Sequence, residues 1–274
     1  MKTLRRLFSN KLAVLGSIFI LLFLICAIFA PWIATYDYSV QDLMNTKAPP
    51  DGNHLFGTDA LGRDIFSGVV YGSRTSLLIG FCVLVLGGGI GIIIGILAGY
   101  FGGWIETILM RIIDSLMAFP AILLALIFVS VLGSGLKSAI IAVSLAQIPR
   151  FARIVRSSVI QIKSNEYVAA AEVLGQSQGK ILFLHILPNG IAPIIIQASL
   201  SFGQSLLIVS GLGFLGVGAD PLSAEWGAML SDARTYLMTA PHLATYPGLA
   251  IAITVLGFNL LGDGLRDALD IKNY

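Results

Sequence analysis

Long apolar runs alternate with short polar segments along the whole chain. A run of about 20 mainly apolar residues is long enough for an α-helix to cross a lipid bilayer. The pattern therefore predicts an all-α membrane protein with six transmembrane helices. The predicted helices cover Leu12–Ile33, Ser76–Phe101, Ile108–Leu132, Leu136–Val159, Ala192–Leu215 and Tyr246–Leu265. Pro120 and Pro149 are expected to kink the helices that contain them.

The composition supports this interpretation and excludes several classes of protein. The chain is 56% hydrophobic and 12% charged, whereas about a quarter of the residues of a soluble protein are charged. Its net charge of +2 is too small to indicate a nucleic-acid partner. Cys26 and Cys82 lie inside apolar runs, and the three histidines are far apart in the sequence. We therefore expect neither a disulfide nor a metal site.

The distribution of basic residues predicts which ends of the helices face the cytoplasm. The first apolar run, of about 22 residues, is too long for a cleaved signal peptide and is predicted to remain as a span. With the N-terminus inside, twelve of the 17 lysine and arginine residues fall on the inner side, as the positive-inside rule requires. The inner residues are Lys2, Arg5, Arg6, Lys11, Arg111, Arg150, Arg153, Arg156, Lys163, Lys180, Arg266 and Lys272; the outer ones are Lys47, Arg63, Arg74, Lys137 and Arg234. Both termini are therefore predicted to be cytoplasmic.

Three arginines mark the inner half of the fourth predicted helix. Arg150, Arg153 and Arg156 follow one another at a spacing of three residues, which places them on one broad face. We expect this face to emerge into an aqueous, phosphate-lined interface.

Small residues predict close packing of the second helix. Gly87, Gly91, Gly95 and Gly99 recur at every fourth position, so they share one face. A face without side chains allows another helix to approach closely. We therefore expect a helix-packing seam along these glycines.

Polar residues form a stripe on the fifth predicted helix. Gln197, Ser201, Gln204 and Ser205 lie within about 100° of arc on a regular helix. Polar side chains in membrane helices tend to face the interior of a bundle or a wet cavity. They are candidates for the translocation path of a solute. The alternative is that they only form hydrogen bonds between helices.

Two glycine-rich stretches resemble nucleotide-binding motifs but lack their chemistry. In Gly175–Ile181 the glycines are one residue too close for a phosphate loop, and isoleucine follows the lysine where serine or threonine is needed. Gly211–Gly216 matches a dinucleotide-binding pattern, but no strand precedes it. The sequence also offers no nucleophile–base pair and no paired catalytic carboxylates at membrane depth. We therefore expect a non-catalytic subunit.

A polar segment between the fourth and fifth predicted helices has a helical pattern of its own. Ser164 or Asn165 is expected to cap a short helix that begins at Glu166 and ends at Gly175. Small and apolar residues on one face form a ridge suited to a groove on a partner protein. The ridge comprises Tyr167, Ala170, Ala171 and Leu174. The alternative is that it packs beneath the bundle of its own chain.

This segment resembles the cytoplasmic loop of ABC importer permeases. The family pattern is E-A-A, three residues, G, nine residues and I-x-L-P. The chain has three alanines from Ala169, then Gly175, then Pro188, all at the family spacing. Ala169 replaces the glutamate of the pattern, and His185 replaces its isoleucine. The sequence HILPN that starts at His185 is typical of the dipeptide, oligopeptide and nickel branch.

Three other stretches resemble the same branch, and most of all the second, C-type permease of its pairs. They are His54–Gly80, Glu225–Pro241 and Phe258–Asp270. The resemblance covers nearly the whole chain and implies the type I ABC importer permease fold.

The resemblance also implies a multi-pass subunit of the bacterial cell membrane that works with separate proteins. A second permease completes a heterodimer, two ATPase subunits bind ATP and magnesium, and an external solute-binding protein delivers the solute. The chain itself is then expected to bind no cofactor. The residues implied to couple it to an ATPase are Glu166, Tyr167, Ala169, Ala170, Ala171, Leu174, Gly175 and Pro188. Those implied to face the binding protein are Glu225, Trp226, Asp232 and Arg234.

The implied function is ATP-driven import of dipeptides, oligopeptides or a related small solute such as a nickel chelate. A secondary transporter or channel without ATP coupling is the alternative, because it also accounts for six spans and a polar stripe. Neither possibility involves nucleic acid.

Three regions are expected along the chain. Residues 1–72 hold the N-terminal tail, the first helix and the first outer loop. Residues 73–265 form the transmembrane core, with a coupling loop at about 160–188 and an outer loop at about 216–245. Residues 266–274 form a cytoplasmic tail.

Overall fold

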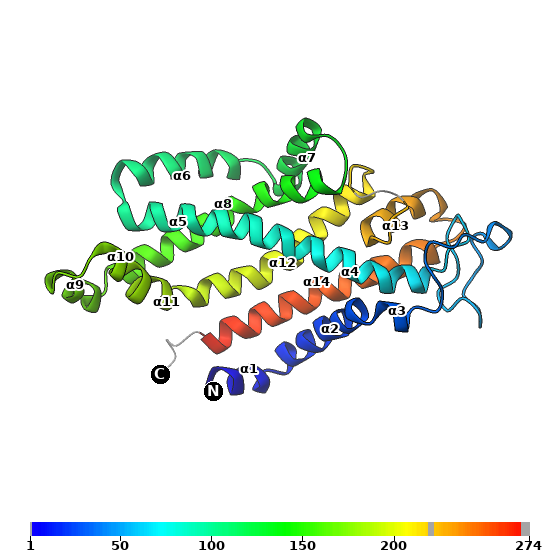
Figure 1. The fold of residues 1–274 in the computed structure, drawn as a ribbon, viewed down its shortest axis with the longest axis horizontal. Helices are drawn as coiled ribbons and strands as arrows, with labels where there is room; N and C mark the ends of the chain where they lie inside the picture. Colours follow the sequence, from blue (N-terminus) through cyan, green and yellow to red (C-terminus); the bar gives the residue numbers. More distant parts are fainter. Residues whose placement is uncertain (1, 219–221, 270–274) are drawn as a thin grey trace.

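The computed structural model describes residues 2–218 and 222–269, and this part of the chain is helical (Figure 1). The α-helices are α1 (Lys2–Ser9), α2 (Lys11–Ile28), α3 (Ala30–Ile33), α4 (Ile65–Val83), α5 (Gly89–Phe101), α6 (Gly103–Met117), α7 (Ala121–Leu132), α8 (Leu136–Lys163), α9 (Glu166–Val173), α10 (Gln178–Lys180), α11 (Leu187–Asn189), α12 (Ile191–Phe214), α13 (Trp226–Ala233) and α14 (His242–Leu269). The π-helical segments are η2 (Leu84–Gly88) and η3 (Ile181–Ile186), and the 3-10 segments are η1 (Leu43–Asn45) and η4 (Arg234–Tyr236). Lys272, the predicted tail beyond residue 269 and residues 219–221 of the predicted outer loop lie outside the described residues.

The long helices run side by side in an elongated bundle, and the short elements gather at its two ends (Figure 1). One end, called the α9 end, holds α1, α9, α10 and α11. The other, called the α13 end, holds α3, α13 and the loop of residues 34–64. The first helix, α1, and the last turn of α14 both lie toward the α9 end (Figure 1). The described chain therefore begins and finishes on the same side of the bundle.

The predicted set of apolar spans is present. Five helical units are long and apolar enough to cross a membrane: α2, α8, α12, α14 and the continuous unit of α4, η2 and α5. A sixth is formed if α6 and α7, which are bent by 95° at their junction, count as one span. The structure therefore confirms an all-α membrane protein and changes the geometry of two predicted spans.

The second span begins eleven residues earlier than predicted, at Ile65 instead of Ser76. The Asp64 carboxylate accepts a hydrogen bond from the Ser67 N–H at 2.8 Å and so caps the first turn. Such a cap satisfies a backbone donor that has no partner within the helix. The added turns contain glycine, serine and Arg74, so hydropathy alone does not mark them as part of a span.

The third predicted span, Ile108–Leu132, is not a single straight helix. α6 ends at Met117 and α7 begins at Ala121, with Pro120 between them. Proline has no N–H for a helical hydrogen bond and disfavours the helical conformation in the residue before it. The helix therefore breaks at this point, whereas α8 continues through Pro149.

The four glycines of the second span lie against α8, where the spacing predicts a packing seam. A Cβ atom on Gly91 would lie 2.8 Å from the carbonyl oxygen of Ile148, and one on Gly95 would lie 2.6 Å from that of Ala152. The other two glycines of the series approach α8 backbone atoms in the same way. The second span and α8 therefore touch through their backbones, with no room for a side chain between them.

Candidate functional site

The short helix predicted between the fourth and fifth spans is α9. It starts at Glu166, and Asn165 stands before it in an extended conformation. Gly175 follows the helix with a φ of +75°, a left-handed conformation that glycine adopts without strain. The predicted start and stop of this helix are therefore confirmed, but the predicted side-chain cap is wrong, because the Ser164 hydroxyl and the Asn165 amide donate to carbonyl oxygens of α8 instead.

One face of α9 is anchored on the bundle and the other is exposed. Val168 and Ala171 are 0% and 4% exposed and belong to one apolar cluster with Val155 and Val159 of α8. The prediction that Ala171 belongs to the exposed ridge is wrong, because it lies on the side of α9 that rests on the bundle. Val173 and Leu174, in contrast, are 88% and 80% exposed.

The other residues implied to couple the chain to an ATPase lie on the surface of the α9 end. They are Glu166, Tyr167, Ala169, Ala170, Leu174, Gly175 and Pro188. The alternative in which the ridge packs beneath its own bundle therefore holds for Ala171 alone. The exposed ridge consists of Tyr167, Ala170, Val173 and Leu174.

One hydrogen bond and an apolar cluster join the α9 end to the long helices, and a second hydrogen bond joins two of these helices to each other. The Tyr100 hydroxyl on α5 donates to the carbonyl oxygen of Gln178 at 3.2 Å. Lys163, the last residue of α8, donates to the carbonyl oxygen of Tyr100 at 2.8 Å. The cluster contains Tyr100, Val155, Val159, Val168, Ala171, Ile181 and Ile186. α9 therefore shares one packed cluster with α5 and α8.

Two of the three arginines on α8 form ion pairs with α6. Arg153 lies 2.5 Å from the Asp114 carboxylate. Arg156 contacts Glu106, to which its Nε donates at 2.7 Å. Carboxylates of the same chain therefore already pair with these two side chains, which stay partly exposed, and the predicted phosphate-lined interface stays a prediction. The pairs line a groove of about 380 Å³ between α6 and α8.

Three of the four predicted pathway residues form hydrogen bonds within the bundle. Gln197 donates to the Ser201 hydroxyl at 2.6 Å, and Ser205 accepts from Gln147 of α8 at 3.0 Å. The side chains of Gln197, Ser201 and Ser205 are all buried. For these residues the geometry favours the alternative role, which is hydrogen bonding inside the bundle.

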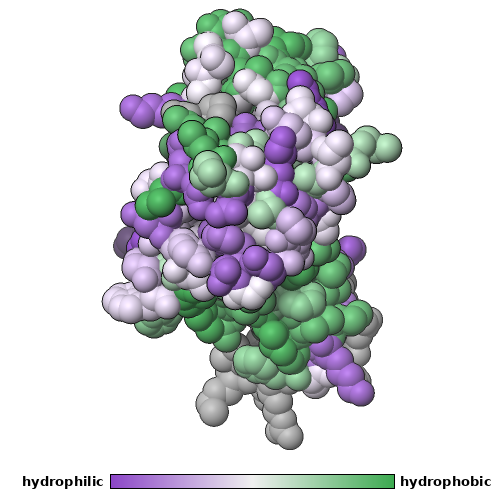
Figure 2. Space-filling model, turned by 90° about the vertical axis from the view of Figure 1, so that its right-hand side faces the viewer, coloured by the Kyte–Doolittle hydropathy of each residue, from purple (hydrophilic) through white to green (hydrophobic). Residues whose placement is uncertain are grey.

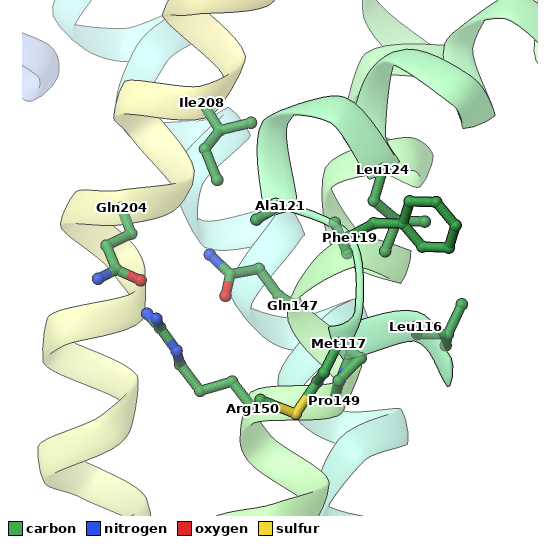
Figure 3. A pocket seen from close by; sticks show the side chains of 11 residues that line it. Leu116, Met117, Phe119, Ala121, Leu124, Gln147, Pro149, Arg150, Gln204 and Ile208 are labelled. Carbon is green, nitrogen blue, oxygen red and sulfur yellow. The ribbon is translucent and has the colours of Figure 1, made fainter. Parts of the chain in front are cut away.

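The fourth pathway residue, Gln204, lines a cavity of about 190 Å³ (Figure 3). The cavity lies between α8, α12 and the break that separates α6 from α7. In Figure 3 the Gln204 amide and the Arg150 guanidinium point toward each other, with the Gln147 amide beside them. The remaining lining residues are Leu116, Met117, Phe119, Ala121, Leu124, Ala146, Pro149 and Ile208. Arg150 and Gln147 are pathway candidates that the sequence does not single out.

Glu225 and Trp226 lie inside the α13 end, so the prediction that they face a binding protein is wrong. Glu225 is 1% exposed, and its carboxylate accepts hydrogen bonds from the N–H groups of Gly227 and Ala228 at 2.9 and 2.8 Å. The Trp226 indole donates to the carbonyl oxygen of Val69 at 3.0 Å. The first turn of α13 is therefore held against α4 and α12 and presents no surface at these two positions.

Asp232 and Arg234 remain as surface candidates at the α13 end. Arg234 is exposed, while Asp232 is partly exposed and lies 3.5 Å from Arg63. Buried Arg63 also pairs with Asp59 at 2.6 Å. These contacts join α13 to the loop of residues 34–64 as one folded cap. Figure 2 views this end directly and shows polar side chains gathered across its middle, with apolar ones above and below.

Two family models match the sequence. One, described as "Binding-protein-dependent transport system inner membrane component", matches residues 91–272. The other, described as "N-terminal TM domain of oligopeptide transport permease C", matches residues 2–50. This chain belongs to the ABC importer permeases.

The permease is similar to curated relatives over nearly its whole length. It is 47% identical to the dipeptide transport system permease protein DppC of Alkalihalophilus pseudofirmus, over 98% of this chain and 88% of the relative. It is 45% identical to the glutathione transport system permease protein GsiD of Pectobacterium atrosepticum, over 98% of this chain and 89% of the relative. These matches confirm the resemblance to C-type permeases.

Solved transporters share the fold of the permease. A chain of the inward-facing MetNI methionine ABC transporter aligns with a TM-score of 0.59 and 19% identity, covering 74% of the permease and 97% of that chain. A chain of an amino acid ABC transporter solved with histidines aligns with a TM-score of 0.56 and 16% identity, covering 74% and 95%. The type I permease fold is therefore confirmed.

Family and fold together define the general role of the permease. It is a multi-pass inner-membrane subunit of an ATP-driven importer. Importers of this class comprise, in general, a partner permease, ATPase subunits and a binding protein.

Asp64 connects the folded loop of residues 34–64 at the α13 end to α4, and its loss is expected to destabilise the folded protein. Besides capping α4, its carboxylate lies 3.0 Å from Nδ1 of His54. We expect Asp64→Ala to lower the free energy of unfolding by about 1–3 kcal/mol, because a helix cap and a buried partner are both lost. Thermal unfolding of the purified permease in detergent measures this loss.

Asp51→Ala is the matched control for this substitution. Asp51 also accepts backbone hydrogen bonds, but its carboxylate is exposed to water. Its replacement should cost about 0.5 kcal/mol, because water can substitute for the lost acceptor. Equal losses for the two variants would contradict the role given to Asp64.

Proposed function

We propose that this permease forms half of the translocation pathway of an importer for short peptides, paired as a heterodimer with a second permease. The printed names of its relatives support the substrate class. One relative is a dipeptide permease and another is a glutathione permease, and both substrates are short peptides with free carboxylates. Neither of these names refers to nickel, so we favour peptides over nickel chelates.

In this proposal the α9 end faces the cytoplasm, where the ATPase subunits bind. Arg6 and Lys180 lie in elements of this end and Lys163 is the last residue of α8 before α9, whereas Lys47 and Arg234 lie at the α13 end. An excess of lysine and arginine is typical of cytoplasmic segments. The polar cap of the α13 end then faces the binding protein, with Asp232 and Arg234 as the surface contacts.

The division of α9 into an anchored face and an exposed apolar ridge is the observation that carries the coupling proposal. Apolar side chains exposed to water are unfavourable unless a partner covers them. A short helix that presents such a ridge fits the helix-in-groove mode of binding. We propose that a groove of an ATPase subunit covers the ridge of Tyr167, Ala170, Val173 and Leu174.

The proposed mechanism follows the contacts of α9 into the bundle. The ATPase subunits hold ATP and magnesium, and their closure displaces α9. Val168 and Ala171 transmit this displacement to α8, because they share an apolar cluster with Val155 and Val159. α8 carries α6 with it through the pair of Arg156 with Glu106. The break between α6 and α7 borders the pathway cavity, so these movements change the access to the cavity.

Reconstitution tests the function directly. The permease, its partner permease and the ATPases are placed in proteoliposomes with the binding protein and labelled alanyl-alanine. We expect uptake that requires both ATP and the binding protein. Absence of uptake, or uptake that proceeds equally without ATP, would overturn the proposal.

A substitution on the exposed ridge tests the coupling helix. We expect Leu174→Asp to reduce the amount of ATPase that co-purifies with the permease by about tenfold or more. A buried unpaired carboxylate is costly in an apolar groove. Because Leu174 is exposed within this chain, the variant should keep the membrane abundance of the wild type.

Met238→Asp is the matched control for the ridge variant. Met238 is 96% exposed at the α13 end, so the same change of an apolar side chain to a carboxylate is made far from α9. It should leave ATPase attachment unchanged. If Leu174→Asp and Met238→Asp retain equal amounts of ATPase, the docking assignment fails.

A further inference from the structure

Arg150 differs from the two arginines that follow it on the same face of α8. Arg153 and Arg156 are paired with acids of α6, but Arg150 has no ion-pair partner among the residues that the structure describes. It is the fifteenth of the 28 residues of α8, so it stands near the middle of a membrane-spanning helix. A charged side chain inside a membrane-spanning helix is costly and usually has a functional partner.

The surroundings of Arg150 are those of a small wet site. Its side chain is exposed to the cavity beside Gln204 and Gln147 (Figure 3). The cavity of about 190 Å³ far exceeds the roughly 10–15 Å³ that one water molecule needs. Water can therefore solvate the guanidinium while no solute is bound. The cavity lining, which lies wholly within the described residues, includes no acidic side chain.

The hydrogen-bonding capacity around the cavity is only partly used. Gln147 donates to Ser205, which fixes its amide and leaves its carbonyl oxygen as an acceptor. The side-chain amide of Gln204 forms no hydrogen bond to another residue in the described part of the chain. The NH₂ group of Gln204 is therefore available as an additional donor, while its carbonyl oxygen is turned toward the guanidinium of Arg150 (Figure 3).

These groups match one end of a peptide. A guanidinium presents a planar fork of donors that fits a carboxylate in a bidentate arrangement. The cavity is smaller than the roughly 300–1,000 Å³ of sites that enclose a whole drug-sized ligand. It is therefore suited to one end group of a solute, while the rest of the solute lies in the wider pathway.

We propose that Arg150, assisted by the amide of Gln204, binds the free carboxylate of the peptide during its passage through the permease. The inference rests on the proposed function for its substrate class. It adds a site within the membrane that distinguishes peptides with a free carboxylate from neutral analogues. Partial exposure to water keeps the contact weak enough for the peptide to leave.

Transport by substituted permeases is the first test. In proteoliposomes containing the complete importer, Arg150→Gln should lower the uptake of alanyl-alanine by about tenfold or more, because the charge is lost. Arg150→Lys keeps the charge without the planar fork and should give an intermediate rate. Arg111→Gln is the matched control, since Arg111 lines the groove between α6 and α8 and not the cavity. Equal uptake by Arg150→Gln and Arg111→Gln would overturn the proposal.

A thiol probe in the cavity tests the site without the binding protein. Ala121→Cys places the probe on the lining, in a background with Cys26→Ser and Cys82→Ser. An anionic methanethiosulfonate should modify it faster than a cationic one, and Arg150→Gln should reduce this ratio by about threefold or more. Alanyl-alanine should slow the modification, whereas alanyl-alaninamide should not. An unchanged ratio, or equal protection by the two peptides, would contradict a carboxylate site.

The two tests separate this inference from the proposed function. If the wild-type importer moves no peptide but alanyl-alanine alone protects the thiol, the proposed function fails and the carboxylate site stands. If the wild type moves alanyl-alanine and Arg150→Gln does so equally well, the carboxylate site fails and the function stands. Should Arg150→Gln be missing from the membrane, the Arg150→Lys rate and the protection of Ala121→Cys still decide the question.

Discussion

Replacing Gly95 with leucine should prevent α5 from packing on α8 and cost more than about 3 kcal/mol of the free energy of unfolding. A Cβ at this position would already lie 2.6 Å from the carbonyl oxygen of Ala152 and 2.6 Å from the Cβ of Val155. A backbone atom cannot move aside as a flexible side chain can, so the two helices must separate. We expect the variant to be nearly absent from membranes and to unfold early in detergent.

Gly89→Leu is the control for this substitution. Gly89 begins α5, and a Cβ there would meet nothing within 4 Å. Leucine has a higher helix propensity than glycine by roughly 0.5–1 kcal/mol, so the control should fold at least as well as the wild type. If Gly89→Leu and Gly95→Leu lowered the free energy of unfolding by similar amounts, the size of the leucine side chain, and not its position in the seam, would be the cause.

The seam was predictable because membrane helices obey a simple spacing rule. Glycines at every fourth position share a face on any regular helix, whatever lies opposite. The apolar spans are predictable for a similar reason, since the thickness of the bilayer sets the length of each run. Neither inference requires knowledge of the neighbouring helix.

The boundaries of two spans were not predictable from hydropathy. The early start of α4 depends on the cap that Asp64 provides, and the turns that follow are too polar to register as a span. The 95° bend between α6 and α7 exceeds the kink that a proline predicts. In both cases local backbone chemistry, and not the apolar content, decides where a helix begins or ends.

The faces of α9 show a second limit of prediction from the sequence. Its sequence, EYVAAAEV, has small or apolar residues around most of its circumference. Periodicity alone therefore does not distinguish the ridge of Tyr167 and Ala170 from the anchored face of Val168 and Ala171. The packing of α9 in a cluster with Val155 and Val159 of α8 makes that choice, and this packing is a tertiary interaction.

The cavity beside Gln204 shows the same dependence on tertiary structure. The sequence marks Gln204 as polar and Arg150 as basic, but the two residues are 54 positions apart. They meet because α8, α12 and the break after α6 converge on one space. The spacing of residues within a single helix contains no information about that convergence.

Glu225→Ala should cost about 3–5 kcal/mol of the free energy of unfolding, because the carboxylate serves several buried groups at once. It accepts from the N–H groups of Gly227 and Ala228, and the Ser76 hydroxyl donates to it at 3.4 Å. Each buried donor left without an acceptor costs roughly 1–3 kcal/mol. Thermal unfolding in detergent measures the loss. Asp42→Ala, which removes the cap of the short segment η1 at an exposed position, should cost less than about 1 kcal/mol.

The pH dependence of stability provides an independent check on Glu225. Burial raises the pKa of this carboxyl, so the folded protein favours its protonated form. The protonated Glu225 carboxyl then contributes its full stabilisation of the folded state below the pKa that it has in the unfolded chain, about 4.3. This stabilisation is lost as the pH rises through the higher pKa that the carboxyl has in the folded protein. Glu225→Gln removes the titrating group, so its melting temperature should fall less than that of the wild type over this range. Parallel pH profiles for the two proteins would show that Glu225 is not the buried acid described here.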